Sequence, residues 1–357
     1  MGARLVTVGA TNPTLLSKTL GGEKTMVRTR DIGRALVGLN VVIVGGLLLS
    51  ACGAPPGDAV GQTSQAVDAD SQARESWREA VARNPSPKDG CFHTSYPSMA
   101  WEQVECGVAP NRPYLPHRSS SPIAPETVGD GSDFAAEVTG LISQSVGTFP
   151  TVTGVTKETD GASNTYSIQL NSNFMTKARC STTPGCMAWE QFVYSSSSEE
   201  AFMQYWLINQ GTCPDSSWMA YEGDCYKNSA GVRVPRLAIS ALASMKMSGA
   251  AVKGGNDTLV FTADGDAYST SGKDSVVELA VDWTGSEFNI IGDGDGSAAT
   301  FNKGASITVK IAVTDGSTAA PVCAANAGTT GETNNLTLGK CTAEGGSTPY
   351  VEFTESR

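Results

Sequence analysis

Histidine is nearly absent from this chain of 357 residues, which holds only His93 and His117. No histidine follows Asp133, where we expect the main domain to begin. A Ser-His-Asp triad needs a histidine beside its nucleophile, so this scarcity argues against that mechanism. The sequence also lacks the GxSxG, HExxH, P-loop and GxGxxG motifs. Any catalysis in the main domain must therefore depend on carboxylates and amides.

Charged residues are also few, at 17% of the chain, and acidic ones predominate. The chain has 36 Asp and Glu against 25 Lys and Arg, which gives a net charge of −11. Because the first 51 residues carry six Lys and Arg but only two Asp and Glu, the rest of the chain is more acidic still. Nucleic acid requires a basic patch for its phosphates, so this composition argues against a nucleic-acid partner. It fits an extracellular domain, or one that is stable at low pH.

Near the N-terminus lies one apolar run, residues 35–49. It is shorter than the roughly 20 residues that a membrane-spanning helix needs. Three arginines precede it, at positions 28, 30 and 34, as in the basic first region of a signal peptide. Met26 stands where such a peptide should start, so we expect translation to begin there. An uncleaved membrane anchor is the alternative.

The run ends in Leu49-Ser-Ala-Cys52, which resembles the bacterial lipobox. That resemblance implies cleavage after Ala51 and diacylglycerol on the Cys52 sulfur. We therefore predict a signal peptide over residues 1–52, and an exported protein held at the bacterial cell envelope by lipid. Gly53, in place of an aspartate, would fit outer-membrane sorting in a Gram-negative host. Residues 53–67 are small and polar and predict a flexible tether.

Eight of the nine cysteines remain when Cys52 is set aside. Eight cysteines allow many connectivities, so spacing alone does not fix the pairing. An even number in an oxidising compartment still favours four local disulfides. A zinc site is the weaker alternative, because no CxxC pair is present and the two histidines are far from most cysteines. We predict no metal and no cofactor. The close sequential pairs are Cys91 and Cys106, Cys180 and Cys186, Cys213 and Cys225, and Cys323 and Cys341.

Residues 133–357 show short β-prone runs separated by Gly, Asp and Asn turns, with almost no helical periodicity. This pattern predicts an all-β domain, a concanavalin-like antiparallel β-sandwich. Residues 68–132 predict an extension with a helix over 68–84, a disulfide loop over 91–106 and an extended proline-rich stretch over 110–125. The extension could be a pro-segment, or an ornament across the main domain. The expected strands are 151–155, 165–170, 237–247, 258–263, 275–281, 287–291, 306–313, 335–338 and 350–353, besides the hairpin described next.

Residues 186–208 are the most aromatic part of the chain and predict a β-hairpin with a polar loop over 195–200. Alternation places Trp189, Gln191 and Val193 on one face of the first strand. On the second strand Phe202, Gln204, Trp206 and Ile208 share a face. A glutamine between a tryptophan and a valine on one face is unusual, which makes Gln191 a candidate functional residue.

Three segments resemble strands of the glutamic peptidases called eqolisins. They are residues 188–194 (AWEQFVY), 203–206 (MQYW) and 286–290 (SEFNI). Eqolisins are β-sandwiches with a catalytic glutamine on one strand and a glutamate in a strand similar to AEWIVE. The resemblance implies that Gln191 and Glu287 are catalytic and that polypeptide is the substrate. Residues 166–170 take the place of the family's WxGIxG strand but lack its glycines. The second acidic residue of the family's glutamate strand is also missing, because Gly292 and Asp293 replace it.

The chemistry of such a pair is plausible. A partly desolvated glutamate can act as general base on water and then as general acid. A glutamine amide can hold that water and donate to the developing oxyanion. The alternative is that Gln191 is a polar residue on a solvated face and that Glu287 begins a strand beside a turn.

Two further features have competing interpretations. Trp189, Trp206 and Trp283, with Gln204, are candidate substrate-binding residues. The same three tryptophans, with Trp101 and Trp218, could line a sugar cleft, but such tryptophans are more often core residues. Residues 293–297 (DGDGS) resemble part of a calcium loop, although a glycine-rich turn is the better interpretation because the distal glutamate is missing. The competing function for the whole domain is a non-catalytic surface module that binds carbohydrate or protein. An envelope structural protein is a third possibility.

Overall fold

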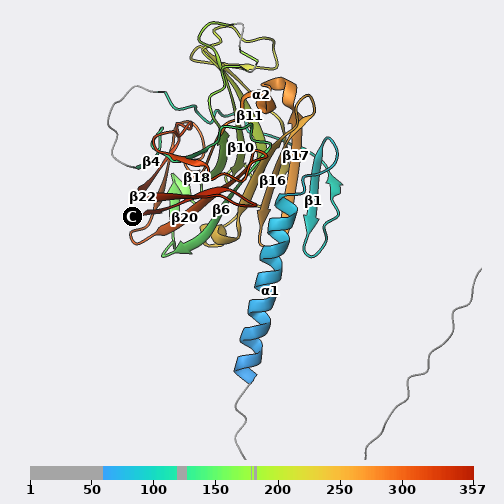
Figure 1. Ribbon diagram of the computed structural model, residues 1–357, viewed down its shortest axis with the longest axis vertical. Helices are drawn as coiled ribbons and strands as arrows, with labels where there is room; N and C mark the ends of the chain where they lie inside the picture. The colour runs from blue at the N-terminus through green and yellow to red at the C-terminus, as the bar shows by residue number, and fades with distance from the viewer. Residues whose placement is uncertain (1–58, 119–126, 178, 181–182) are drawn as a thin grey trace, which may run out of the picture. The chain divides into compact units, whose positions relative to one another are not determined.

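A computed structural model of the chain describes residues 59–118, 127–177, 179–180 and 183–357 (Figure 1). The predicted signal peptide, with its lipobox-like segment and Cys52, lies outside the described residues. Within them the fold is all-β, as predicted, and consists of two large sheets. The described helices are α1 (Ala59–Ala82), α2 (Leu279–Asp282) and two 3-10 turns, Ile239–Ser244 and Asp274–Val276. None of these helices is long and apolar enough to span a membrane.

The first sheet has 13 strands, almost all antiparallel. Only β19 and β22 pair in parallel among the pairs described. Its order is β2 (Glu102–Val104), β1 (Cys91–Ser95), β17 (Asp266–Lys273), β16 (Asn256–Ala263), β15 (Lys246–Ala251), β6 (Gln144–Thr153), β20 (Ser306–Thr314), β23 (Tyr350–Ser356), β22 (Thr333–Glu344), β19 (Ala298–Phe301), β7 (Glu158–Asp160) and β8 (Ala162–Ser163), with β4 (Thr127–Gly129) beside β22.

The second sheet, of 10 strands, holds the aromatic hairpin at its centre. Its order is β12 (Met219–Tyr221), β13 (Asp224–Asn228), β11 (Glu200–Ile208), β10 (Met187–Ser195), β9 (Ser167–Ser172), β18 (Gly285–Ile291), β5 (Ala135–Glu137) and β21 (Val322–Ala324), with β14 (Ala230–Arg233) beside β11 and β3 (Gly107–Val108) beside β14.

The two sheets share one apolar core, as expected of a sandwich. Phe288 of β18 packs on Phe149 of β6 with ring centroids 4.9 Å apart, and Tyr194 of β10 stacks on Phe261 of β16 at 4.5 Å. The approach is close because β6 carries a glycine opposite Phe288. A Cβ on Gly147 would lie 2.1 Å from that ring. The hairpin strands β10 and β11 are therefore buried on this side by the facing sheet.

The predicted extension is part of the same compact unit and not a separate module. It supplies strands β1 to β4 to the two sheets. Helix α1 is fixed at its C-terminal end, where Trp77 and Val81 are buried against Ala267 and the indole of Trp77 donates to the Ser98 carbonyl at 2.7 Å. The helix begins at Ala59, so part of the expected tether over 53–67 is helical.

Two of the predicted strands are wrong. Residues 239–244 form a 3-10 turn before β15 begins at Lys246, although a strand was expected over 237–247. Residues 275–281, also expected as a strand, form a 3-10 turn followed by α2. The chain turns there because Glu278 has a left-handed backbone (φ 61°), which a strand does not accommodate.

The four local disulfides are confirmed. Cys91 is bonded to Cys106, Cys180 to Cys186, Cys213 to Cys225 and Cys323 to Cys341. Each closes a loop of at most 18 residues. The bridges therefore fasten local loops to the sheets.

Candidate functional site

A row of polar side chains crosses the second sheet on the side away from the shared core. Directly paired residues of neighbouring strands point to the same face. The row consists of Asn228, Gln204, Gln191, Asn171 and Glu287, on β13, β11, β10, β9 and β18 in that order. We call these five residues the polar row. It places Gln191 and Glu287 on one face, two strands apart, with Asn171 between them.

A second pair of amides lies beside the row. Gln169 of β9 pairs with Val193 on one side and with Asn289 of β18 on the other. Strand β9 therefore carries polar residues on this face and apolar Ile168 and Leu170 on the core side. Sequence reasoning missed Asn171, Gln169 and Asn289. The available signal was this strict alternation in the strand before the hairpin.

Glu287 is buried and strongly hydrogen bonded. Its Oε2 accepts from the Thr329 backbone N–H at 2.7 Å, the Thr329 hydroxyl at 2.9 Å, the Asn171 amide at 3.2 Å and the Thr330 backbone N–H at 3.3 Å. The Thr329 hydroxyl has one hydrogen, which can also go to the Ser172 carbonyl at 3.0 Å, while the three N–H groups fix the position of Oε2. The other oxygen, Oε1, is buried on the side of Asp133, and the two carboxyl groups interact directly.

Asp133 forms a buried carboxyl pair with Glu287. Burial and then the neighbouring charge of Glu287 raise the pKa of Asp133 well above its usual range. Like charges at close range cannot both ionise easily, so Asp133 holds the proton of the pair. The amide of Asn289 donates to Asp133 Oδ1 at 3.1 Å and to Glu355 Oε2 at 3.3 Å. Burial raises the pKa of Glu355 to about 8.

Glu332 is a further buried carboxyl on this face that the sequence did not single out. Its Oε1 accepts from the Leu115 backbone N–H at 2.8 Å, and its Oε2 accepts from the Thr330 hydroxyl at 2.7 Å and the Gln169 amide at 3.4 Å. Burial raises its pKa to about 7. Among the described residues, no group of three or more His, Cys, Asp or Glu is arranged to hold a metal ion.

Four of the five residues of the polar row are closed to solvent, and Asn228 at its end is partly buried. Gln191 and Gln204 have no exposed surface, and Glu287 is 2% exposed. Residues 109–117 lie over Gln204 and Gln191, and we call this segment the strap. The loop over residues 327–331 covers Glu287. The described part of the predicted proline-rich stretch, residues 110–118, thus lies across the domain, over the residues proposed to be catalytic.

Tryptophans surround the site differently from the prediction. Trp189 and Trp206 lie on the face of the polar row, and both are fully buried. Trp283 lies on the opposite side, in the core between the sheets, with its ring 6.1 Å from that of Phe192. It therefore does not line the same cleft. Trp218 is also buried, and Trp101 is only partly exposed, with its indole donating to the Asn84 carbonyl at 3.0 Å. The row of exposed tryptophans that a glycan would need is therefore not present among the five.

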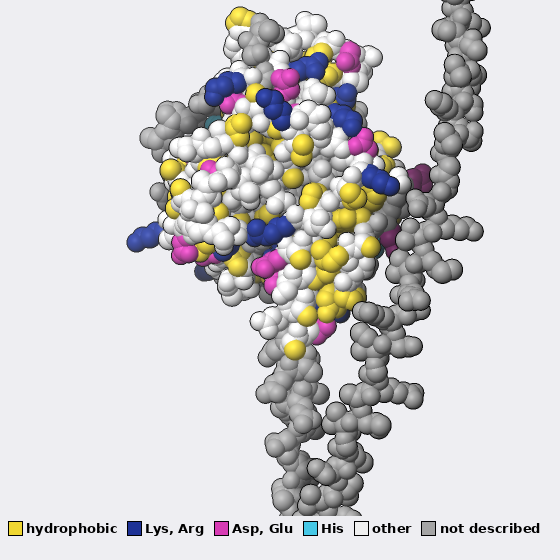
Figure 2. Space-filling model, turned by 45° about the vertical axis from the view of Figure 1, so that its right-hand side comes forward, with side chains coloured by type: hydrophobic (Ala, Val, Ile, Leu, Met, Phe, Trp, Pro, Cys, Tyr) yellow, Lys and Arg dark blue, Asp and Glu magenta, His cyan; other side chains and the backbone are white. Residues whose placement is uncertain are grey.

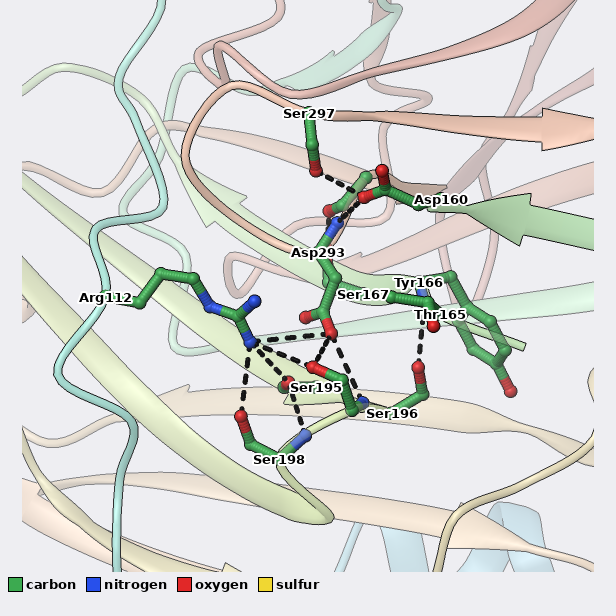
Figure 3. Close-up of polar contacts among 12 residues, drawn as sticks. Arg112, Asp160, Thr165, Tyr166, Ser167, Ser195, Ser196, Ser198, Asp293 and Ser297 are labelled. Carbon is green, nitrogen blue, oxygen red and sulfur yellow. Dashed lines mark hydrogen bonds and ion pairs between the residues drawn. The ribbon is translucent and has the colours of Figure 1, made fainter. Parts of the chain in front are cut away.

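A polar network joins the strap to two loops (Figure 3). Asp293, in the turn after β18, accepts from the Tyr114 hydroxyl at 2.8 Å, and Ser197 donates to it through both its backbone and its side chain. Arg112 lies 3.5 Å from the same carboxylate and donates to Ser197 at 3.0 Å and to Ser198 at 3.2 Å. The carboxylate that resembled a calcium ligand thus binds the strap.

Charged side chains are mixed on the surface. Figure 2 shows Lys and Arg lying among Asp and Glu on the visible face.

The comparisons with known proteins return one kind of neighbour. No protein-family model matches the chain, and no curated protein matches it by sequence. Among solved structures it is similar to scytalidoglutamic peptidase with a peptide-based transition-state analogue, at 13% identity and a TM-score of 0.31, over 65% of this chain and 98% of that one. It is also similar to SCP-B, a member of the eqolisin family in complex with the tripeptide Ala-Ile-His, at 13% identity and a TM-score of 0.29, over 64% and 97%. Membership of the family does not follow from these values.

Proposed function

We propose that the protein is a latent acid-acting hydrolase of polypeptides that uses Glu287 and Gln191. In this proposal it is exported and held by lipid on Cys52 at the bacterial cell envelope. The observation that carries the proposal is the polar row, which brings the two side chains to one face of the sheet beside the Asp133–Glu287 carboxyl pair. Neither a cofactor nor nucleic acid has a part in it.

The proposed chemistry follows from the donor and acceptor roles of these groups. The Glu287 carboxylate would take a proton from the attacking water and return it to the leaving amine. The Gln191 amide would donate to the oxyanion that forms on the scissile carbonyl. Asp133 would act as a positioning residue, because its retained proton keeps the second carboxyl of the pair neutral while Glu287 is ionised.

Both proposed catalytic residues are engaged in the described form, which is why we call the enzyme latent. The Gln191 amide donates to the Tyr114 carbonyl of the strap at 2.7 Å, and Glu287 is held by Thr329 and Thr330. Water and substrate can reach them only if the strap and the 327–331 loop move.

A non-catalytic polypeptide-binding module is the second candidate. The contacts of Glu287 Oε2 favour it, because an oxygen already bound by Thr329, Thr330 and Asn171 is not free to accept a proton from water. This candidate keeps the amides of the row as the binding groups and assigns Glu287 a structural role.

The decisive experiment is cleavage of an unfolded protein from about pH 2 to 7, a range that spans the titration of ordinary and raised carboxyls. We expect cleavage in acid by the wild-type chain and none by Glu287→Gln or Gln191→Ala. The matched controls are Glu352→Gln and Gln103→Ala, which change the same residue types outside the site. Equal cleavage by the site variants and the controls would refute the assignment. Absence of cleavage by folded wild-type protein at every pH would favour the binding module.

Lipid attachment is tested separately. Labelled fatty acid should be incorporated by the full-length chain in a bacterial host and lost in Cys52→Ser. Incorporation that persists in Cys52→Ser would refute the anchor.

A further inference from the structure

The strap bends at Asn111, where the Arg112 N–H donates to the Pro110 carbonyl at 2.9 Å, and crosses the polar row from there without a further turn. Carbonyls of every second residue are bound by amides on successive strands. The Pro110 carbonyl accepts from Asn228 at 2.9 Å, the Arg112 carbonyl from Gln204 at 3.0 Å, and the Tyr114 carbonyl from Gln191 at 2.7 Å. The strap therefore advances one strand of the sheet for every two of its residues.

The backbone N–H groups of the strap are bound as well. Tyr114 N–H donates to Gln204 Oε1 at 2.7 Å, and Leu115 N–H donates to Glu332 at 2.8 Å. His117 N–H donates to the Thr329 carbonyl at 2.6 Å, and the Leu115 carbonyl accepts from Gly331 N–H at 2.7 Å. These contacts bind main-chain groups, which every polypeptide has, and do not depend on a particular side chain of the strap.

Two apolar clusters flank the polar row, and each packs against one of two neighbouring strap residues. Tyr114 packs with Val193 and Phe202, with its ring 5.7 Å from that of Phe202. Leu115 packs on the cluster of Trp189 and Trp206. A polypeptide with an aromatic residue followed by an aliphatic one can therefore pack against both apolar clusters.

The row is an unusual feature for a face that serves structure alone. Amides in the interior are acceptable only when hydrogen bonded, and an apolar face would cover a sheet at less cost in desolvation. Here Gln191 keeps one buried oxygen, Oε1, without a partner, and so does Asn171 with its Oδ1. The strap thus satisfies the row incompletely, and a ligand with a further donor could bind it better.

We propose that the polar row is a binding track for an extended polypeptide with adjacent aromatic and aliphatic residues, and that the strap is its resident occupant. A polypeptide in trans competes with the strap for the same amides. This deepens the proposed function by naming the ligand of the same face, and it rests on that function only in assigning this face to the substrate.

The test is binding of a fluorescent peptide with the sequence of residues 109–117, followed by anisotropy. The full chain carries Arg112→Ala and Tyr114→Ala, which remove the contacts of the strap to Asp293 and Phe202 but leave the row intact. We expect the peptide to bind this variant at least ten-fold more tightly than wild type. The matched control is Lys310→Ala with Tyr350→Ala, a second cation–tyrosine pair on the first sheet, which should behave as wild type.

A second step assigns the binding to the row. Gln204→Ala and Gln191→Ala, each added to the variant with the weakened strap, should weaken peptide binding about five-fold, the equivalent of roughly one hydrogen bond. A scrambled peptide that does not place an aromatic before an aliphatic residue should bind less tightly. If the double variant does not fold, Arg112→Ala alone serves, since Arg112 is part-exposed and its loss removes the ion pair to Asp293, the hydrogen bonds to the 195–198 loop and the contact with the Tyr114 ring, but leaves every backbone contact of the strap in place.

A folded strap variant that binds the peptide no better than the control would overturn the proposal. Binding that is insensitive to both glutamine substitutions would also overturn it. Either failure is separable from failure of the hydrolase, because peptide binding is measured at equilibrium and requires no cleavage. A chain that binds the peptide but does not cut protein in acid supports the track and refutes the hydrolase.

Discussion

Glu355 offers the sharpest test of how the carboxyl cluster depends on pH. It lies on β23 with its side chain buried, and its Oε1 has no hydrogen-bond partner among the described contacts. The groups facing it are the Asn289 and Asn334 amides and, beyond Asn289, the carboxyls of Asp133 and Glu287. No cation is among these neighbours. Burial is the largest cause that raises its pKa from 4.5 to about 8.

The sign of the effect follows from linkage. Between pH 4.5 and about 8 the unfolded chain releases the Glu355 proton while the folded chain keeps it. The stability that protonated Glu355 allows is therefore fully present below the unfolded pKa and is lost as the pH rises through the folded one. Each pKa unit is worth about 1.4 kcal/mol, so the loss is on the order of 5 kcal/mol. That is comparable to the whole stability of a small domain, about 5–15 kcal/mol.

We predict that Glu355→Gln abolishes this part of the pH dependence. The amide resembles the protonated acid in shape and keeps a donor and an acceptor but does not ionise. Chemical unfolding followed by tryptophan fluorescence from pH 4 to 9 should give similar free energies of unfolding for variant and wild type at pH 4. At pH 8.5 the variant should be more stable by several kcal/mol. Glu352→Gln, on the same strand but partly exposed, should follow wild type.

Parallel curves for wild type and Glu355→Gln over the whole pH range would refute the reasoning. They would mean that Glu355 is ionised in the folded state without a cost, and that burial is not what controls its proton.

Two other predictions concern stability. Replacing both Cys91 and Cys106 by alanine opens a loop with a sequence separation of 15, and should lower the free energy of unfolding by about 3 kcal/mol in denaturant titration, with an unchanged midpoint refuting a stabilising bridge. Gly147→Ala places a methyl 2.1 Å from the Phe288 ring and should lower the free energy of unfolding by about 1–3 kcal/mol, detected as a lower thermal midpoint. Phe288→Leu in the same chain should restore part of the lost stability. Full stability of Gly147→Ala alone would contradict the close packing.

The hairpin, and the face of the sheet on which each of its residues lies, were predictable because the signal is local. Period-two alternation in residues 187–195 and 200–208 is enough to place Gln191 with Trp189, and Gln204 with Trp206. The same rule applied to β9 would have found Asn171 and Gln169. The fold class followed from repeated short strands and turns in the same way.

The position of the strap over the site could not be predicted from the sequence. The strap residue Tyr114 meets Gln191, 77 positions later in the chain, and Leu115 meets Glu332, 217 positions later. No local pattern encodes such contacts. The Asp133–Glu287 carboxyl pair also depends on contacts between distant parts of the chain, since Asp133 is brought to Glu287 by the pairing of β5 with β18. The wrong strand over 275–281 shows the limit of β-propensity, because tertiary context can turn a β-branched run into a helical turn.

The strap is covalently part of the molecule that it covers, and this determines the concentration at which a free polypeptide can displace it. It continues on one side from β3, which pairs with β14, and on the other side the chain returns to the sheet at β4. A ligand tethered by short linkers has an effective concentration in the millimolar range. A free polypeptide with the same intrinsic affinity would thus need millimolar concentrations to occupy half of the molecules. A single break in the strap removes that advantage, because each half then keeps only some of the contacts.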